Sequence, residues 1–93
     1  MATLMMATMQ GMTPEVYDAI NRELNFPDEV PDGLLSHTAA EVEGGMQIVD
    51  VWESMDKFEA FMNDQLGPAA GRAGFEGGPV DQRQGEVRFR WSS

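Results

Sequence analysis

The 93-residue chain contains no cysteine, and this absence excludes several kinds of site at once. Such a chain forms no disulfide, binds no metal through thiolates and attacks no substrate with a thiol. Histidine is scarce too: His37 is the only one, and no H-x-x-H or clustered carboxylate spacing accompanies it. Walker, dinucleotide and G-x-S-x-G motifs are also absent from the sequence. We therefore expect neither a metal nor a cofactor.

Long apolar runs are lacking as well. No stretch approaches the roughly 18 apolar residues that a membrane span needs. The opening MATLMMATM is apolar but has neither a basic n-region nor a convincing cleavage site, so it does not indicate a secretory signal. We expect no membrane association, and the cytoplasm is the default location.

Basic residues are few, with 6 Lys and Arg against 16 Asp and Glu, which gives a net charge of −10. An acidic surface repels phosphate backbones and argues against a nucleic-acid partner. Attraction of a cationic partner is one interpretation of the charge. The simpler interpretation is a solvated surface that keeps the protein soluble, and we favour it.

The length and the hydrophobic share of 42% predict a single globular domain over residues 1–93. Small domains without disulfides or metals often gain stability by associating. Size alone therefore favours a homo-oligomer.

The first half of the chain predicts a strand, a helix and a hairpin. Residues 2–9 (ATLMMATM) form a short apolar run typical of a buried strand. Residues 13–15 (Thr-Pro-Glu) open a helix with a hydroxyl N-cap, a proline at the first position and an acid in the first turn. That helix ends between residues 25 and 31, and residues 33–43 and 46–53 then flank Gly44-Gly45, which predicts a hairpin turning at these two glycines. The helix carries apolar side chains at helical spacing, namely Val16, Tyr17, Ile20 and Leu24.

The second half predicts a helix and a last strand. Ser54 is the expected N-cap, and Gly67-Pro68 is expected to break or kink the helix. The Gly/Ala-rich stretch that follows, as far as Pro79, predicts a loop or a short helix. Residues 86–91 (EVRFRW) alternate in polarity, which predicts a half-exposed strand. The apolar stripe of the second helix consists of Phe58, Phe61, Met62 and Leu66.

The resulting order is β-α-β-β-α-β, which predicts an α+β, ferredoxin-like fold: a four-stranded antiparallel sheet with both helices on one face. Apolar residues occur at both parities of the hairpin strands, for example Val49 and Val51 at one and Ile48 and Trp52 at the other. A sheet that is apolar on both faces but covered by helices on only one needs a second sheet against it. We therefore expect a homodimer that forms through the open sheet face.

Four segments, GMTPEVYDAI, PDGLLSH, GGMQIVDVWES and KFEAFMNDQLGPA, make the chain resemble a known group. Over roughly residues 3–70 it is similar to small dimeric α/β-barrel proteins of an actinobacterial type. These belong to the superfamily of the antibiotic-biosynthesis monooxygenases and the stress-responsive barrel proteins. The resemblance implies a dimeric α/β barrel with a ligand pocket between the sheet and the helices of each protomer.

The same resemblance implies a possible activity. Enzymes of this superfamily include oxygenases that use no metal or flavin, because an electron-rich phenolic substrate itself reduces oxygen. Trp52 and, through a looser alignment, Arg72 match positions that those enzymes use. Ile48 stands where they have an asparagine, and Phe58 where they have an aromatic hydroxyl.

His37 and Asp50 are the candidate catalytic residues. With the turn at Gly44-Gly45, His37 pairs with Trp52 and Ala39 with Asp50, and all four share the face that we expect to look toward the helices. Histidine exchanges protons near neutral pH, so His37 is a candidate general base for a phenol or an acidic carbon. Asp50 either fixes the tautomer of His37 or acts separately; a purely structural role for both residues is the alternative.

The candidate substrate-binding residues are mostly aromatic. A carboxylate in a central strand needs a partner, water or a cavity, and an indole N–H needs an acceptor, so a pocket beside Asp50 and Trp52 satisfies both. Each aromatic candidate has a plain core role as its alternative, and for Tyr17 a position at the pocket rim. The set comprises Trp52, Phe58, Tyr17, Phe61 and Arg72.

Three functions remain open from sequence. The first is a dimer that binds a small apolar or aromatic molecule. The second is a cofactor-independent, monooxygenase-like enzyme that acts on an aromatic or polyketide-type substrate, and the third is a purely structural or accessory dimer. A cavity bounded by His37, Asp50 and Trp52 would favour the first two, whereas a solid core would favour the third.

Overall fold

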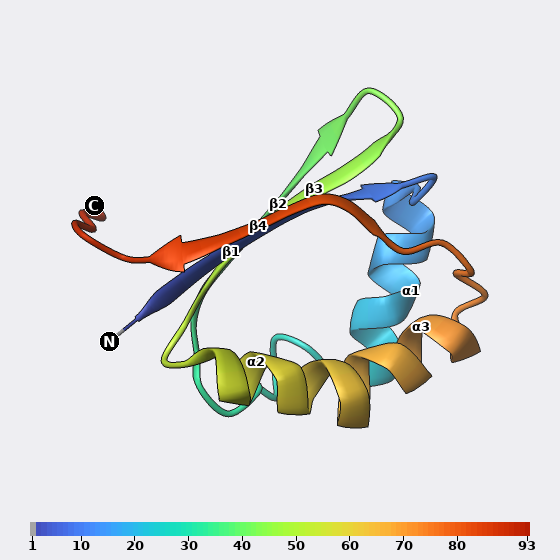
Figure 1. Ribbon diagram of the computed structural model, residues 1–93. Helices are drawn as coiled ribbons and strands as arrows, with labels where there is room; N and C mark the ends of the chain where they lie inside the picture. Colours follow the sequence, from blue (N-terminus) through green and yellow to red (C-terminus); the bar gives the residue numbers. More distant parts are fainter. Residues whose placement is uncertain (1) are drawn as a thin grey trace.

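The computed structural model describes residues 2–93, and within them the helices cover one face of an antiparallel sheet (Figure 1). The strands lie in the order β2-β3-β1-β4, so the first and third strands are central and the second and fourth are edges. This is the α+β, ferredoxin-like arrangement that the sequence predicted. The elements are β1 (Thr3–Gln10), α1 (Pro14–Leu24), β2 (Leu34–Val42), β3 (Gly45–Trp52), α2 (Met55–Phe61), the π-helical segment η1 (Met62–Leu66), α3 (Gly67–Arg72) and β4 (Pro79–Glu86).

Helices α1 and α2 begin where the capping residues of the sequence indicated. The hydroxyl of Thr13 accepts from the amide of Val16 at 3.2 Å, and that of Ser54 accepts from the amide of Lys57 at 3.3 Å. Each bond satisfies one of the amides that an α-helix leaves free in its first turn. The first helix ends at Asn25, which adopts a left-handed conformation with φ 56°. Asparagine tolerates this conformation better than most residues, so the end of α1 is encoded locally.

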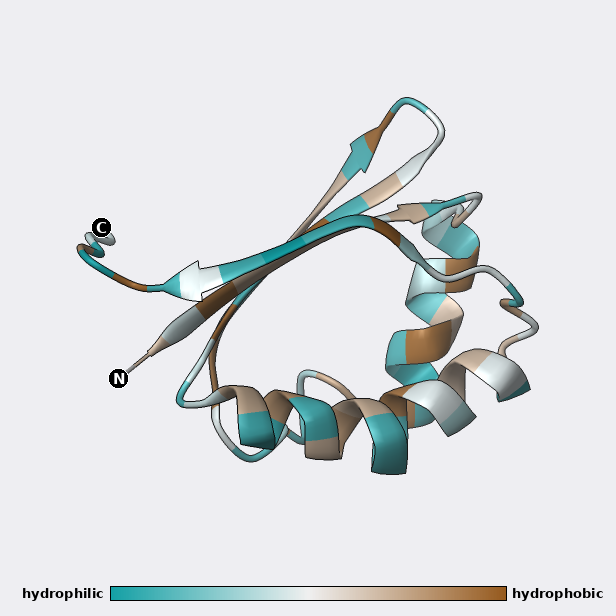
Figure 2. Ribbon diagram, in the orientation of Figure 1, coloured by the Kyte–Doolittle hydropathy of each residue, from teal (hydrophilic) through white to brown (hydrophobic). Residues whose placement is uncertain are grey.

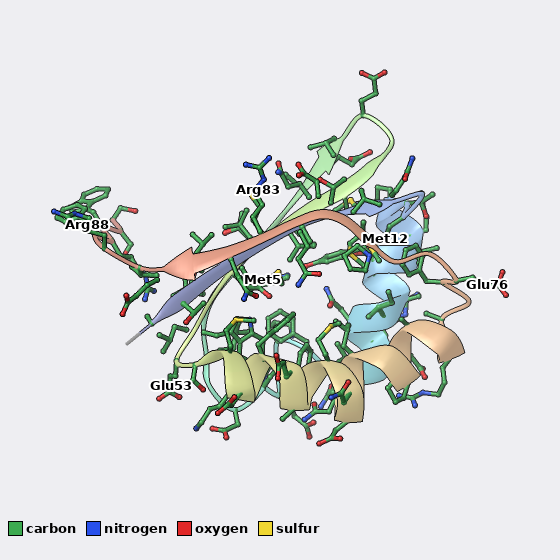
Figure 3. All side chains as sticks on the ribbon, in the orientation of Figure 1. Met5, Met12, Glu53, Glu76, Arg83 and Arg88 are labelled. Carbon is green, nitrogen blue, oxygen red and sulfur yellow. The ribbon has the colours of Figure 1, made fainter. Side chains whose placement is uncertain are left out.

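The two sheet faces differ in what covers them. On the helix side, Met5 and Ala7 of β1 and Trp52 of β3 are buried against α2. The side chain of Met5 points toward the helices, whereas Arg83 of β4 points to the other side (Figure 3). The predicted face shared by His37, Asp50 and Trp52 is confirmed, because all three line the space between sheet and helices.

The hairpin turn lies one residue earlier than predicted. Val42 pairs with Gly45, so the two turn residues are Glu43 and Gly44, and Gly44 alone has a positive φ, of 89°. Gly45 is already part of β3 and lies against the carbonyl oxygen of Met9 in β1, where a side chain would collide. The second glycine thus serves close strand packing and not the turn, a requirement that the dipeptide alone does not reveal.

This shift moves the register by two residues and preserves the faces. His37 lies opposite Asp50 and not opposite Trp52, and Ala39 lies opposite Ile48 and not opposite Asp50. Because side chains alternate with a period of two, the same residues still point toward the helices.

The sequence predicted a break or a kink at Gly67-Pro68, and the helix does not break there. Helical structure continues from α2 through η1 into α3, with the amide of Gly67 bonded to the carbonyl of Met62, five residues back. Proline has no backbone N–H to donate, and it is tolerated here in the first turn of α3, directly after the widened π-turn. Within residues 2–93, no helix is long and apolar enough to cross a membrane.

The last strand was also placed wrongly. It spans Pro79–Glu86 and pairs with β1, instead of spanning residues 86–91. Beyond it, the amide of Val87 bonds to the carbonyl of Ala2, just before β1, and the side chain of Arg90 bonds to the carbonyl of Leu35 in β2. The alternating residues after Val87 are not part of a strand. Phe89 and Trp91 are 85% and 77% exposed. The true strand is exposed along its length and polar after Val80, and Figure 2 shows it mostly in hydrophilic colours.

Candidate functional site

A cavity lies between the sheet and the helices, with a volume of about 220 Å³. Its wall is mainly apolar and comes from every layer of the fold: the helix-facing side chains of β1, β2 and β3 on one side, and α1, α2 and α3 on the other. Six of the seven predicted site residues line it. They are Tyr17, His37, Asp50, Trp52, Phe58 and Phe61.

Four of these residues form one chain of hydrogen bonds. The hydroxyl of Tyr17 is 2.6 Å from Nε2 of His37, and Nδ1 of His37 is 2.6 Å from Oδ1 of Asp50. Nε1 of Trp52 donates to the other carboxylate oxygen of Asp50 at 3.3 Å. The first helix contributes Tyr17, and the hairpin contributes the other three, so the chain joins the two layers of the domain.

The hydrogen-bond partners fix the direction of this chain. Trp52 can only donate, and ionised Asp50 can only accept, so Nδ1 of His37 carries a hydrogen and donates it to Asp50. Nε2 of neutral His37 is then an acceptor, which Tyr17 satisfies with its O–H. Both carboxylate oxygens of Asp50 are thereby paired although the residue is only 6% exposed, which is what a buried charge requires.

Aromatic rings hold the polar chain in place. The ring of Phe26 meets that of His37 edge-on at 5.5 Å between centroids, and Tyr17 lies parallel to His37 within 3°. Trp52 is 1% exposed and contacts Phe58 and Phe61 at 5.6 and 5.4 Å between centroids. Trp52 is therefore a core side chain and a cavity wall together, and Asp50 satisfies its N–H.

Arg72 does not join the other candidates. The uninterrupted helix through Gly67 carries it to the outer surface of α3, where its Nε is 2.5 Å from Oε1 of Glu23 in α1. Its side chain is 55% exposed and does not line the cavity. The resemblance suggested Arg72 as a substrate-binding residue through a loose alignment, whereas in the structure its side chain forms a surface ion pair.

Some cavity residues were missed from sequence. Asn21 lies one helical turn after Tyr17 on α1, so its spacing could have indicated it. Gln82 reaches the cavity beside an irregularity where β4 slips against β1, between the partners of Met6 and Thr8. Phe26 follows the left-handed Asn25, and no periodicity places it. Among residues 2–93 no group of three histidines or carboxylates is arranged to hold a metal ion.

No protein-family model and no curated protein matches the chain. Solved structures do match. One, from Chloroflexus aurantiacus, is named after antibiotic-biosynthesis monooxygenases; it is 18% identical with a TM-score of 0.70, covering 99% of this chain and 98% of the other. SnoaB, a cofactor-independent oxygenase from Streptomyces nogalater, is 16% identical with a TM-score of 0.64, covering 99% and 97%. The Mycobacterium tuberculosis protein Rv0793 is 16% identical with a TM-score of 0.59, covering 98% of both chains.

The chain has the fold of the antibiotic-biosynthesis monooxygenases. The likeness extends over nearly the full length of both chains in each comparison, including the C-terminal part that the sequence resemblance did not cover. The TM-scores establish the shared fold. Because the identities are below one fifth, the chemistry must be argued from the residues of this site.

Proposed function

We propose that this protein is a homodimeric member of the antibiotic-biosynthesis-monooxygenase superfamily that binds a small apolar or aromatic molecule. The observation that carries the proposal is the cavity between sheet and helices, lined mainly by apolar side chains with one polar wall at His37 and Asp50. Small-molecule sites typically combine a largely apolar concave surface with a few polar groups that orient the ligand. A purely structural dimer would need no such space.

The proposed dimer forms through the outer face of the sheet. Register places Val49 of β3 on that face, beside Met6 of β1, and both are partly exposed in the protomer. Leu4 is 36% exposed and Val80 of β4 is 42% exposed. A second copy that packs its own outer face against these side chains would remove them from water, which is the main source of favourable free energy in association.

Ligand binding is tested by thermal unfolding with 4-nitroanisole, a small aromatic molecule without an ionisable group. A ligand that binds only the folded state raises the unfolding temperature. Ala70→Leu adds three carbon atoms to the cavity wall and should weaken this rise. Ala60→Leu makes the same change at an exposed position of α2 and should leave it intact. No rise with the wild-type protein over a series of such aromatics would refute the proposal.

A second candidate function is a cofactor-independent oxygenation of an electron-rich phenol. The hydrogen-bonded chain from Tyr17 to Asp50 favours it, because a group able to take the proton of a phenol opens onto the cavity. The fold shared with SnoaB adds a fold-level analogy. Oxygen uptake with electron-rich phenols tests it, and equal rates for wild type, His37→Ala and Asp50→Asn would remove the assigned roles.

A further inference from the structure

Resting on the ligand-binding function proposed above, we propose that Tyr17, and not His37, is the group that exchanges a proton with the ligand. His37 then acts as the internal acceptor of that proton, and Asp50 balances its charge. The cavity is in consequence built for a ligand that carries an ionisable hydroxyl, such as a phenol or an enol.

The hydrogen-bond inventory leaves Tyr17 as the end of the chain. Both ring nitrogens of His37 already have partners, at 2.6 Å each. Both oxygens of Asp50 are occupied by His37 and Trp52. The phenolic oxygen of Tyr17 gives its hydrogen to His37 and retains acceptor capacity for a hydroxyl in the cavity.

The other polar residues at the cavity do not supply this function. Asn21 and Gln82 also line it, but their amides hydrogen-bond without taking a proton. Lys57 and Arg72 are on the surface, paired with Asp32 and Glu23 respectively. Within the described residues, the chain that begins at Tyr17 is therefore the route by which a proton leaves the cavity.

The proton transfer balances without any oxidant or added reagent. The ligand O–H bond breaks as a new O–H bond forms on Tyr17, and the original O–H bond of Tyr17 breaks as an N–H bond forms at Nε2 of His37. His37 keeps the hydrogen on Nδ1 and becomes a cation next to the carboxylate of Asp50. The products are a ligand oxyanion, neutral Tyr17 and an imidazolium–carboxylate pair, and no electrons change centre.

The apolar wall makes this proton relay, from the ligand through Tyr17 to His37, measurable. An oxyanion in a desolvated apolar cavity is unfavourable by itself, so a phenol bound there without the relay stays protonated. With the relay, the oxyanion accepts a charge-assisted hydrogen bond from Tyr17 and lies near the positive charge on His37. The protonation state of a bound phenol thus reports on the relay and not on folding.

The experiment uses 4-nitrophenol, whose phenol and phenolate forms differ in colour, with 4-nitroanisole as the matched compound that lacks the hydroxyl. Absorbance of the bound probe is recorded near the pKa of free 4-nitrophenol, at saturating protein. We expect the ratio of phenolate to phenol in the wild-type complex to exceed that in Tyr17→Phe by about tenfold or more, the equivalent of one charge-assisted hydrogen bond. Affinity for 4-nitroanisole should be nearly the same in both proteins.

Two further variants separate proton transfer from hydrogen bonding. His37→Gln retains groups that bond to Tyr17 and Asp50 but cannot accept a proton, and Asp50→Asn removes the balancing charge; both should leave the bound probe as the phenol. Asp64→Asn, the same chemical change at an exposed position of η1, should retain the wild-type spectrum. Far-ultraviolet circular dichroism of each variant establishes that it is folded before the spectra are compared.

The outcomes separate this inference from the proposed function. If 4-nitroanisole binds but the wild type and Tyr17→Phe hold 4-nitrophenol in the same form, the relay is wrong and the ligand-binding function stands. A phenolate that persists in His37→Gln also overturns the relay. If neither compound binds the wild type, the proposed function itself fails.

Discussion

His37 and Asp50 lie directly opposite each other across β2 and β3, with Nδ1 and Oδ1 2.6 Å apart. This pairing explains how a carboxylate is accommodated in a buried stretch of a central strand. Asp50 is one of three consecutive buried residues at the end of β3, yet both of its oxygens have donors. The hairpin register therefore determines both the stability of the strand and the polar wall of the cavity.

Removal of the Asp50 carboxylate should destabilise the protein. Asp50→Ala leaves the N–H groups of His37 and Trp52 without an acceptor, and the expected cost in the free energy of unfolding is about 2–3 kcal/mol. Asp50→Asn should cost less, since its carbonyl oxygen still accepts one of the two bonds. Urea denaturation measures both, and Asp64→Asn at an exposed site is the control that should change little. An Asp50→Ala protein as stable as wild type would contradict this account of the strand.

Truncation of the two tryptophans should affect the free energy of unfolding to very different extents. Trp52 is 1% exposed, so Trp52→Ala should lower the free energy of unfolding by about 3–5 kcal/mol. Trp91 is 77% exposed and lies beyond β4, so Trp91→Ala should leave protomer stability within about 0.5 kcal/mol of wild type. In Trp91→Phe, the remaining tryptophan fluorescence should be protected from acrylamide. Ready quenching in that variant would show that Trp52 is not enclosed as described.

A methyl group at Gly45 should destabilise the protein, although this residue has no positive φ. The added Cβ would collide with the carbonyl oxygen of Met9, and backbone atoms of two paired strands cannot easily move apart. We expect Gly45→Ala to lower the free energy of unfolding by about 1–3 kcal/mol. Gly71→Ala, in α3 with open space around it, should instead stabilise by about 0.4–1 kcal/mol. Equal effects of the two substitutions would contradict the proposed role of Gly45.

These residues also show what the sequence reveals and what it does not. Local signals located the caps at Thr13 and Ser54, and alternation in the hairpin assigned His37 and Asp50 to the helix-facing side. Those features depend on nearby residues and a fixed period. The direct contact between His37 and Asp50 depends on the exact turn residues, so an error of one residue in the turn changed the predicted partners but not the face.

The last strand and the course of the helix after Leu66 were not predictable from local patterns alone. The alternating tail around Phe89 has the pattern of a strand, but the edge of β1 is already taken by the polar segment that precedes it. Pattern alone does not say which of two adjacent segments finds a partner. Arg72 was suggested by alignment alone; it lies outside the cavity on a helix that continues past Pro68 through the π-turn before Gly67, and no residue type announces a π-turn.

Lys57 should make a small, pH-dependent contribution to stability. A hydrogen bond that Lys57 donates to Asp32, together with the charges of Asp32 and Glu53, raises the pKa of Lys57 above its ordinary value of 10.5. The stabilisation is fully present below the unfolded-state pKa and is lost as pH rises through the folded-state pKa. Lys57→Met should therefore be less stable than wild type at neutral pH and equally stable once the lysine is neutral, as measured by urea unfolding. Added salt should reduce the neutral-pH difference, because the pair is exposed.

The proposed dimer predicts that a charge on the outer sheet face separates the protomers. Val49 of β3 lies opposite Thr38 of β2 and Met6 of β1 on that face, so Val49→Lys would place an ammonium in the centre of the apolar contact. Burial of an unpaired charge costs several kcal/mol, enough to abolish association at micromolar concentration. Sedimentation velocity should show twice the protomer mass for wild type and the protomer mass for Val49→Lys. Ala60→Lys, which adds the same charge on the exposed side of α2, should remain dimeric. A wild-type protein that sediments as a single protomer would refute the sheet-to-sheet dimer, and dissociation of both variants would attribute the effect to charge in general and not to this face.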